Sequence, residues 1–302
     1  MDKPMKNRTA NKEFVITTII KISGYSAIFF VVIIFYFLLS QGLPTLKLVN
    51  FSSLFSTRWY PIEDYYGLWP LITGSLVVTI GAAIVAVPFG IGTAIFLAEV
   101  APRWLREILK PIIEILAGLP SVVLGFIGIA VLSSAVRVTF DLPTGLSAFT
   151  GALLLGAISI PTIVSVAEDA LDAVPKEYRD GALALGGTRW QAVWTVVLPA
   201  ARSGVLTAVM LGIARSIGET MTVMMVTGNA PVIANSLRVF FSPVRTMTAT
   251  IAAEMGEVAH GSTHYHVLFF IGIVLFVISL IINVIASSYV YRNTKRSEKL
   301  LS

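Results

Sequence analysis

The sequence predicts an all-α integral membrane protein with six membrane-spanning helices, and composition is the first reason. Hydrophobic residues make up 56% of the 302 residues, charged residues only 13%, and the mean hydropathy is +0.83. A soluble globular domain usually carries about 25% charged residues. A buried core cannot explain so large a deficit, so we expect most of the helices to contact membrane lipid.

The second reason is the set of long apolar windows, because a spanning helix needs about 20 apolar residues. Five windows contain no charged residue, namely 22–46, 71–98, 115–136, 142–167 and 267–291. A sixth window, 203–228, contains only Arg215 and Glu219 as charged residues. The chain therefore divides into an N-terminal arm with the first span and an extracytoplasmic loop, a membrane core and a tail, which cover residues 1–70, 71–291 and 292–302.

The third reason is the distribution of Lys and Arg, which concentrate in cytoplasmic segments of membrane proteins. With the N-terminus inside, fifteen of them fall in inner segments and only five in outer ones, which are Lys47, Arg58, Arg137, Arg238 and Arg245. We therefore expect a multi-pass protein of the cytoplasmic (inner) membrane with both termini in the cytoplasm. The first apolar run is too long for a signal peptide and is expected to be a retained anchor.

The longest inner connection, residues 172–199, predicts two short helices at the membrane surface. Pro175 suits the first position of a helix, and Gly186 can end that helix in a left-handed conformation. Thr188 can cap a second short helix. The first helix carries an apolar stripe at helical spacing, formed by Tyr178, Ala182 and Leu185. Glu168 and Asp169, just before this connection, are expected to be solvated.

This connection resembles the EAA loop of ABC-importer permeases, whose form is E-A-A-x-x-x-G, nine residues, then I-x-L-P. The matching positions are Asp180, Gly181, Ala182, Gly186, Leu198 and Pro199. Asp replaces Glu and Gly replaces the first Ala, so no indispensable charge role is assigned to Asp180. The resemblance implies a type I ABC importer permease fold whose coupling helices lie between spans four and five. These positions, with Leu185, would then dock on a cytoplasmic ATPase; a simple membrane-surface hairpin is the alternative.

Four stretches together resemble the PstC-type permeases of phosphate importers. They are ILAGLPSVVLGFIG (115–128), AEDALDAVPKEYRDGALALG (167–186), IARSIGET (213–220) and TATIAAEMGEVAHGSTHYHVLFF (248–270). The resemblance implies four partner subunits: a PstA-like second permease, two PstB-like ATPases and a PstS-like extracytoplasmic phosphate-binding protein. It also implies that ATP and Mg²⁺ bind to the ATPases, so no cofactor is expected on this chain. The scattered basic residues give no reason to expect a nucleic acid partner.

Arg215 and Glu219 are the candidate residues of a translocation path. Arg215 lies twelve residues beyond Ser203, hence about 18 Å deep at 1.5 Å per residue, near the middle of the hydrocarbon core. A charge there costs about 2.5–3.5 kcal/mol on insertion scales. In a continuous helix Glu219 would pair with Arg215 at i+4, and a purely structural ion pair is the plain interpretation. Our hypothesis is that Arg215 binds phosphate, Glu219 holds Arg215 when the path is empty, and Thr220 adds a hydroxyl donor.

The absence of three common catalytic motifs argues against an enzyme. The sequence contains no G-x-x-x-x-G-K-[ST], H-E-x-x-H or G-x-S-x-G, so ATP hydrolysis is expected only on a partner. Two other transport functions stay open. One is a permease for another oxyanion, such as sulfate or molybdate. The other is a proton-coupled secondary transporter that uses Glu219 as its proton carrier, although no internal repeat supports it.

Overall fold

The computed structural model describes residues 5–233 and 237–301. Residues 1–4 of the expected N-terminal arm, residues 234–236, and residue 302 of the expected tail lie outside this description. Within the described chain, five helices are long and apolar enough to cross a membrane, or six if a bent pair counts as one span. The helical membrane architecture predicted from composition is thus confirmed, with a two-stranded sheet outside the spans.

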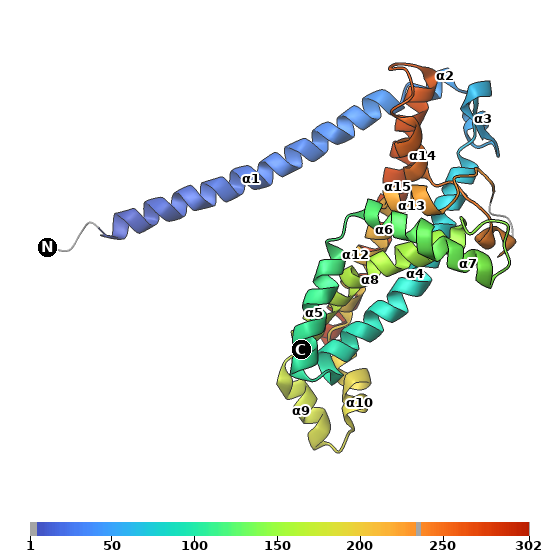
Figure 1. Ribbon diagram of the computed structural model, residues 1–302. Coiled ribbons are helices and arrows are strands. Elements are labelled where there is room, and N and C mark those ends of the chain that lie inside the picture. Colours follow the sequence, from blue (N-terminus) through green and yellow to red (C-terminus); the bar gives the residue numbers. More distant parts are fainter. Residues whose placement is uncertain (1–4, 234–236, 302) are drawn as a thin grey trace.

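The first part of the chain contains one long helix, a small extramembrane unit and the second span. In order these elements are α1 (Met5–Gly42), α2 (Thr45–Leu48), α3 (Phe51–Leu54), β1 (Trp59–Tyr60), β2 (Tyr65–Tyr66) and α4 (Trp69–Ile95). A π-helical segment, Phe96–Val100, continues α4. Figure 1 shows α1 extending away from the other helices, and its apolar window is 0% buried within this chain. Lipid or another subunit must therefore cover it.

The middle of the chain holds spans three and four and a helical hairpin. In order these elements are α5 (Arg103–Ala117), α6 (Ser121–Ile127), α7 (Ser134–Thr139), α8 (Ala148–Asp172), α9 (Lys176–Ala184), α10 (Arg189–Ala192) and α11 (Leu198–Ala200). π-helical turns fill the two short gaps, at Gly128–Ser133 and Val193–Val197. Helices α9 and α10 form the α9–α10 hairpin, which projects from one end of the molecule (Figure 1).

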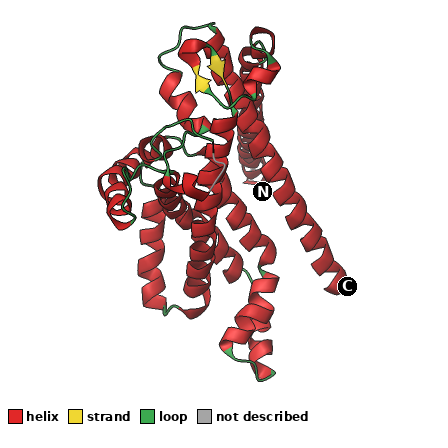
Figure 2. Ribbon diagram, turned by 90° about the vertical axis from the view of Figure 1, so that its right-hand side faces the viewer, coloured by secondary structure: helices red, strands yellow, loops and turns green. Residues whose placement is uncertain are grey.

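The last part contains spans five and six. Its helices are α12 (Arg202–Gly218), α13 (Met221–Val226), α14 (Met247–Glu254) and α15 (Thr263–Leu301), with a 3₁₀ turn at Leu237–Phe241 before α14. The chain bends by 74° between Arg189–Ala200 and α12. Figure 2 shows the two short strands at the end of the molecule opposite the α9–α10 hairpin. Those strands pair antiparallel, with Trp59 opposite Tyr66.

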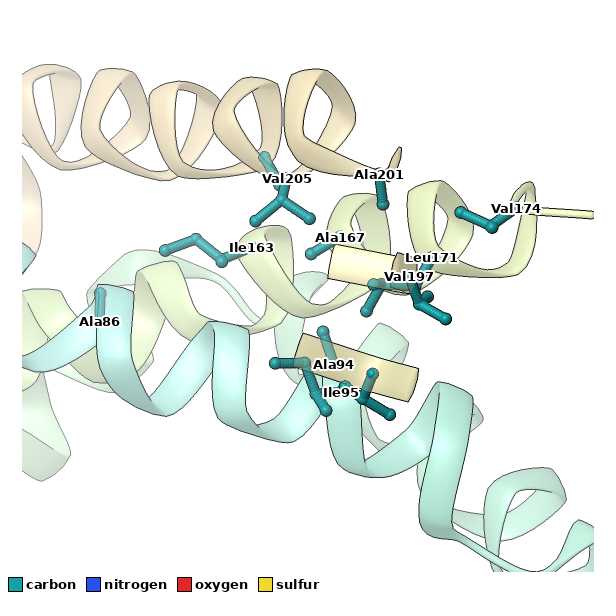
Figure 3. Close-up of a cluster of buried hydrophobic side chains, with 12 residues drawn as sticks. Ala86, Ala94, Ile95, Ile163, Ala167, Leu171, Val174, Val197, Ala201 and Val205 are labelled. Atoms are coloured by element: carbon teal, nitrogen blue, oxygen red, sulfur yellow. The ribbon is translucent and has the colours of Figure 1, made fainter. Parts of the chain in front are cut away.

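Helices α4, α8 and α12 pack closely around Ile163 of α8. A Cβ atom added at Gly90 of α4 would lie 2.7 Å from Ile163 Cγ2, and one added at Gly212 of α12 would lie 2.4 Å from Ile163 Cγ1. Glycine at both positions lets the three helices approach, as small residues do in membrane proteins. Figure 3 shows the resulting cluster of buried side chains, which reaches from Ala86 in the membrane core to Val197 beside the hairpin.

Two of the predicted spans are broken, which corrects the expectation of continuous helices over 115–136 and 203–228. In the third span α5 ends at Ala117 and a new helical stretch runs from Ser121 to Thr139. Pro120 explains this break, because proline lacks an N–H and disfavours helix at the preceding residue. In the fifth span α12 ends at Gly218, and Glu219 has an extended backbone with ψ 129°.

Candidate functional site

Arg215 connects three helices near the break in the fifth span. Its Nη1 donates to Thr162 Oγ1 of α8 at 3.1 Å, and its Nη2 donates to the carbonyl oxygen of Ala117 at 3.0 Å. Ala117 is the last residue of α5, where the helix dipole is negative and the final carbonyls lack helical partners. Arg215 therefore caps α5 from a neighbouring helix.

Glu219 lies at the break, two residues before the short helix α13 begins at Met221. Its Oε1 accepts a hydrogen bond from the backbone N–H of Thr222 at 3.2 Å, and its backbone carbonyl accepts one from Thr248 Oγ1 at 3.1 Å. The predicted ion pair between Glu219 and Arg215 is absent from the contacts of the described residues. The helical i+4 geometry that would form it ends at Gly218, so the carboxylate turns to the next helix instead.

The breaks in spans three and five contact each other. Thr222 Oγ1 donates to the carbonyl oxygen of Ser121, the first residue of α6, at 3.0 Å. Thr220, predicted to add a donor to the path, donates from Oγ1 to the carbonyl of Gly218 at 3.2 Å. Its hydroxyl thus satisfies local backbone in this conformation, and its role in the path stays a prediction.

A narrow polar cavity of about 10 Å³ lies beside Glu219. Five hydroxyl side chains contribute to its wall, namely those of Ser75, Thr79, Ser216, Thr246 and Thr248. A cavity of this size holds about one water molecule and is too small for a phosphate ion. Sequence reasoning missed this cluster because the five residues come from three separate segments. Ser216 also bonds to Ser159 Oγ at 2.8 Å, which extends the polar contacts toward Thr162 on α8.

The α9–α10 hairpin has the predicted two helices and turn. Thr188 caps α10 in a capping box with Gln191, as the sequence predicts. Gly186 has φ +83°, the left-handed conformation that glycine adopts without strain. The large apolar side chains of the hairpin are exposed, and Leu185 is 92% exposed. The hairpin therefore presents apolar surface with no covering partner within the described chain.

The predicted coupling residues fall into two groups. Asp180, Gly181, Ala182, Leu185 and Gly186 belong to α9 and the turn after it. Leu198 and Pro199 lie instead next to the 74° bend before α12, where Leu198 packs against the buried cluster of Figure 3. The first group is thus placed to meet a partner, and the second connects the hairpin to the fifth span.

Ion pairs at the hairpin end were not predicted. Glu168, expected to be solvated, is only 1% exposed and pairs with Arg106 at 2.7 Å and with Lys110 at 3.3 Å. Asp172, the last residue of α8, also pairs with Arg106. The two basic residues belong to α5, whose other end is capped by Arg215. Helix α5 is thus fixed at both ends, and its partners lie too far away in sequence for local patterns to reveal them.

Comparisons with known proteins agree with this architecture. A family model described as "Binding-protein-dependent transport system inner membrane component" matches residues 86–297. The probable ABC transporter permease protein YqgH of Bacillus subtilis (strain 168) is 42% identical over 230 residues, which are 76% of this chain and 74% of that protein. The phosphate transport system permease protein PstC of Xylella fastidiosa (strain Temecula1) is 35% identical over an alignment of 274 residues, which covers 84% of this chain and 83% of that protein.

Solved structures are similar in fold. The MetNI methionine ABC transporter in an inward-facing conformation has a TM-score of 0.56 at 19% identity, covering 75% of this chain and 94% of that chain. The crystal structure of an amino acid ABC transporter with histidines has a TM-score of 0.54 at 17% identity, covering 82% of this chain and 98% of that chain. At these identities the similarity concerns the fold alone.

Proposed function

The chain belongs to the inner membrane components of binding-protein-dependent transport systems and has the fold of a type I ABC importer permease, and we propose that it transports inorganic phosphate. The observation that carries the substrate is the similarity to PstC proteins over most of both chains. A mid-membrane arginine supports it, because a guanidinium group offers planar paired donors to phosphate oxygens and stays protonated when buried.

Arg215 is the proposed anion ligand of the path. In the present conformation its donors are occupied by Ala117 and Thr162. An arriving phosphate would replace these neutral acceptors with charged oxygens, which form stronger hydrogen bonds. Glu219 is proposed to act on the path by holding the start of α13 and by placing a negative charge near the anion. Thr220, at the break, would supply a hydroxyl to the passing ion.

The α9–α10 hairpin is the proposed contact with a cytoplasmic ATPase. Its exposed apolar side chains and the spacing from Asp180 to Pro199 support this assignment. The chain would then import phosphate with a PstA-like permease, two PstB-like ATPases that bind ATP and Mg²⁺, and a PstS-like binding protein outside. The chain itself is not proposed to be an enzyme. Both termini and the hairpin would face the cytoplasm, as the basic residues predict.

The narrow cavity beside Glu219 supports a mechanism of alternating access. A space for one water cannot pass phosphate, so the cavity must widen during transport. ATP binding would close the ATPases and move the hairpin. The fifth span would follow, because Leu198 and the bend join the hairpin directly to α12. Release of products would restore the narrow state.

Uptake of labelled phosphate into proteoliposomes that contain the complete complex tests this function. We expect uptake that requires ATP and the binding protein and that unlabelled phosphate inhibits, whereas sulfate and molybdate do not. Inhibition by sulfate or molybdate at equal concentration would instead indicate another oxyanion. Uptake that persists without the ATPase subunits and collapses with the proton gradient would contradict an ABC mechanism.

A further inference from the structure

Arg179 joins the α9–α10 hairpin to two membrane helices. Its Nη2 and Nε donate to Glu99 Oε1 at 2.6 and 3.0 Å, and Nε also reaches Oε2 at 3.2 Å. The same guanidinium group donates to the carbonyl oxygens of Leu171 at 2.8 Å and Val174 at 2.5 Å. Glu99 lies in the π-helical segment that continues α4, and Leu171 lies in the last turn of α8. One side chain of α9 thus holds the ends of both helices.

The surroundings of Arg179 make this contact stronger than a surface ion pair. The side chains of Arg179 and Glu99 are 20% and 11% exposed, so water screens their attraction only in part. The carbonyl groups at the end of α8 add negative potential from the helix dipole. Lysine would keep the charge but lose the planar fork that reaches both partners at once.

The other charged residues of α9 have a different environment. Lys176, Glu177 and Asp180 are exposed. Within the described chain, Arg179 is the one residue of α9 that forms an ion pair. One face of the helix is therefore left for a partner, while Arg179 points back toward the membrane helices. Docking on a partner and transmission of movement to the membrane helices are thus assigned to different faces of α9.

Apolar packing beside Arg179 supports the same connection. Val193 and Val197, from the π-helical turn after α10, are buried in one cluster with Ile95 of α4 and Leu171 of α8. Figure 3 shows Val197, Ile95 and Leu171 close together at this end of the molecule. Close-packed protein interiors transmit displacement because they contain little free volume. A shift of the hairpin must therefore move α4 and α8 or break these contacts.

We propose that Arg179 and Glu99 are positioning residues that carry movement of the hairpin into α4 and α8. Leu198 and the bend join the hairpin to α12, whereas this ion pair adds a direct polar link to α4 and α8. The inference rests on the proposed docking of the hairpin to an ATPase. It predicts that loss of the forked contact that Arg179 makes with Glu99 and the end of α8 separates ATP hydrolysis from transport without removing the ATPase from the complex.

The test compares Arg179→Lys, Glu99→Gln and the double variant in the complete complex reconstituted in proteoliposomes. Arg103→Lys is the matched control, because Arg103 also pairs with a glutamate but through side chains that are 94% and 67% exposed. The measurements are phosphate taken up per ATP hydrolysed, stimulation of hydrolysis by the loaded binding protein, and co-purification of the ATPase.

For each single variant we expect the uptake per ATP to fall on the order of tenfold, with the ATPase still bound. The double variant should be no worse than either single one, and Arg103→Lys should match the wild type. Three results would each contradict the proposal that Arg179 and Glu99 connect the hairpin to α4 and α8. They are an unchanged uptake per ATP, additive losses in the double variant, and loss of the ATPase from the complex. A wild-type complex that hydrolyses ATP but takes up no phosphate would instead contradict the proposed function.

Discussion

Arg215 Nη2 donates a 3.0 Å hydrogen bond to the carbonyl oxygen of Ala117, a residue 98 positions earlier in the chain. The bond fixes the end of α5 to α12 at the point where the third span breaks. An anion that binds Arg215 must compete with this carbonyl and with Thr162. Occupancy of the path would therefore alter how firmly α5 is held.

The first prediction concerns Arg215. Replacement by Gln retains hydrogen-bond donors for Ala117 or Thr162 but removes the positive charge, so phosphate uptake should be abolished while assembly remains intact. Uptake into proteoliposomes and co-purification of the partner subunits measure the two effects. Arg137→Gln is the control, because Arg137 is exposed near the end of the third span. Near-normal uptake by Arg215→Gln would refute its role as anion ligand.

The second prediction separates two functions of Glu219. Glu219→Gln keeps a side-chain oxygen that can accept from Thr222 N–H, whereas Glu219→Ala removes this hydrogen bond, which is typically worth about 1 kcal/mol. If the hydrogen bond to Thr222 is the contribution of Glu219, Glu219→Gln should retain most of the uptake and Glu219→Ala should lose it. A proton carrier would be inactivated equally by both changes. Uptake at several pH values, measured for both variants, distinguishes these outcomes.

The third prediction concerns the turn of the hairpin. A Cβ atom at Gly186 would meet no atom within 4 Å, so backbone conformation rather than space restricts this position. Gly186→Ala should destabilise the turn by about 1–2 kcal/mol, the cost of a left-handed conformation for an L-residue. It should therefore weaken ATPase binding, measured by co-purification. Gly24→Ala is the control, since this glycine of α1 also has free space and an ordinary φ but lies outside the hairpin. Equal behaviour of both variants would contradict the argument.

The fourth prediction is a pH dependence at the opposite end of the molecule. Burial disfavours the charged form of Glu254, but hydrogen bonds from His264 and Trp59 and the charge of Arg245 outweigh it and lower its pKa below the ordinary value of 4.5. A lowered folded-state pKa gives stability that is complete above the unfolded value and is lost as pH falls through the folded value.

Thermal unfolding of the detergent-solubilised protein measures this effect. Above pH 4.5 the wild type should unfold at a higher temperature than Glu254→Gln, and the difference should shrink as the pH is lowered further. Glu257→Gln serves as the control, because Glu257 has an exposed side chain three residues away. A difference between wild type and Glu254→Gln that grows toward acid would show the opposite sign of linkage.

Hydropathy predicted most of the fold because lipid imposes it. A window without charges must form a helix to satisfy its backbone, so α4, α8 and α15 overlap the windows 71–98, 142–167 and 267–291. The breaks were harder to predict. Pro120 gave a local signal, whereas Gly218 gave none because glycine is common inside membrane helices, and the contact of Glu219 with α13 depends on the tertiary arrangement.

Hydropathy also predicted part of the candidate site. Charge in an apolar window identified Arg215, but its partners Ala117 and Thr162 come from helices distant in sequence. Glu168 was misjudged because an acidic residue near a helix end usually reaches water. Here Arg106 of α5 covers it, and only the three-dimensional packing brings the two together.

The contact between the two helix breaks also bears on the electrical work of import. Helical stretches begin again at Ser121 and Met221, so the first backbone groups of two helical stretches on neighbouring spans lie close together. Water that reaches such groups thins the insulating layer on that side. The membrane potential then falls across a shorter distance, at about 2.3 kcal/mol per elementary charge for 100 mV. Most of the work of moving an anion inward would be concentrated in one short step past Arg215.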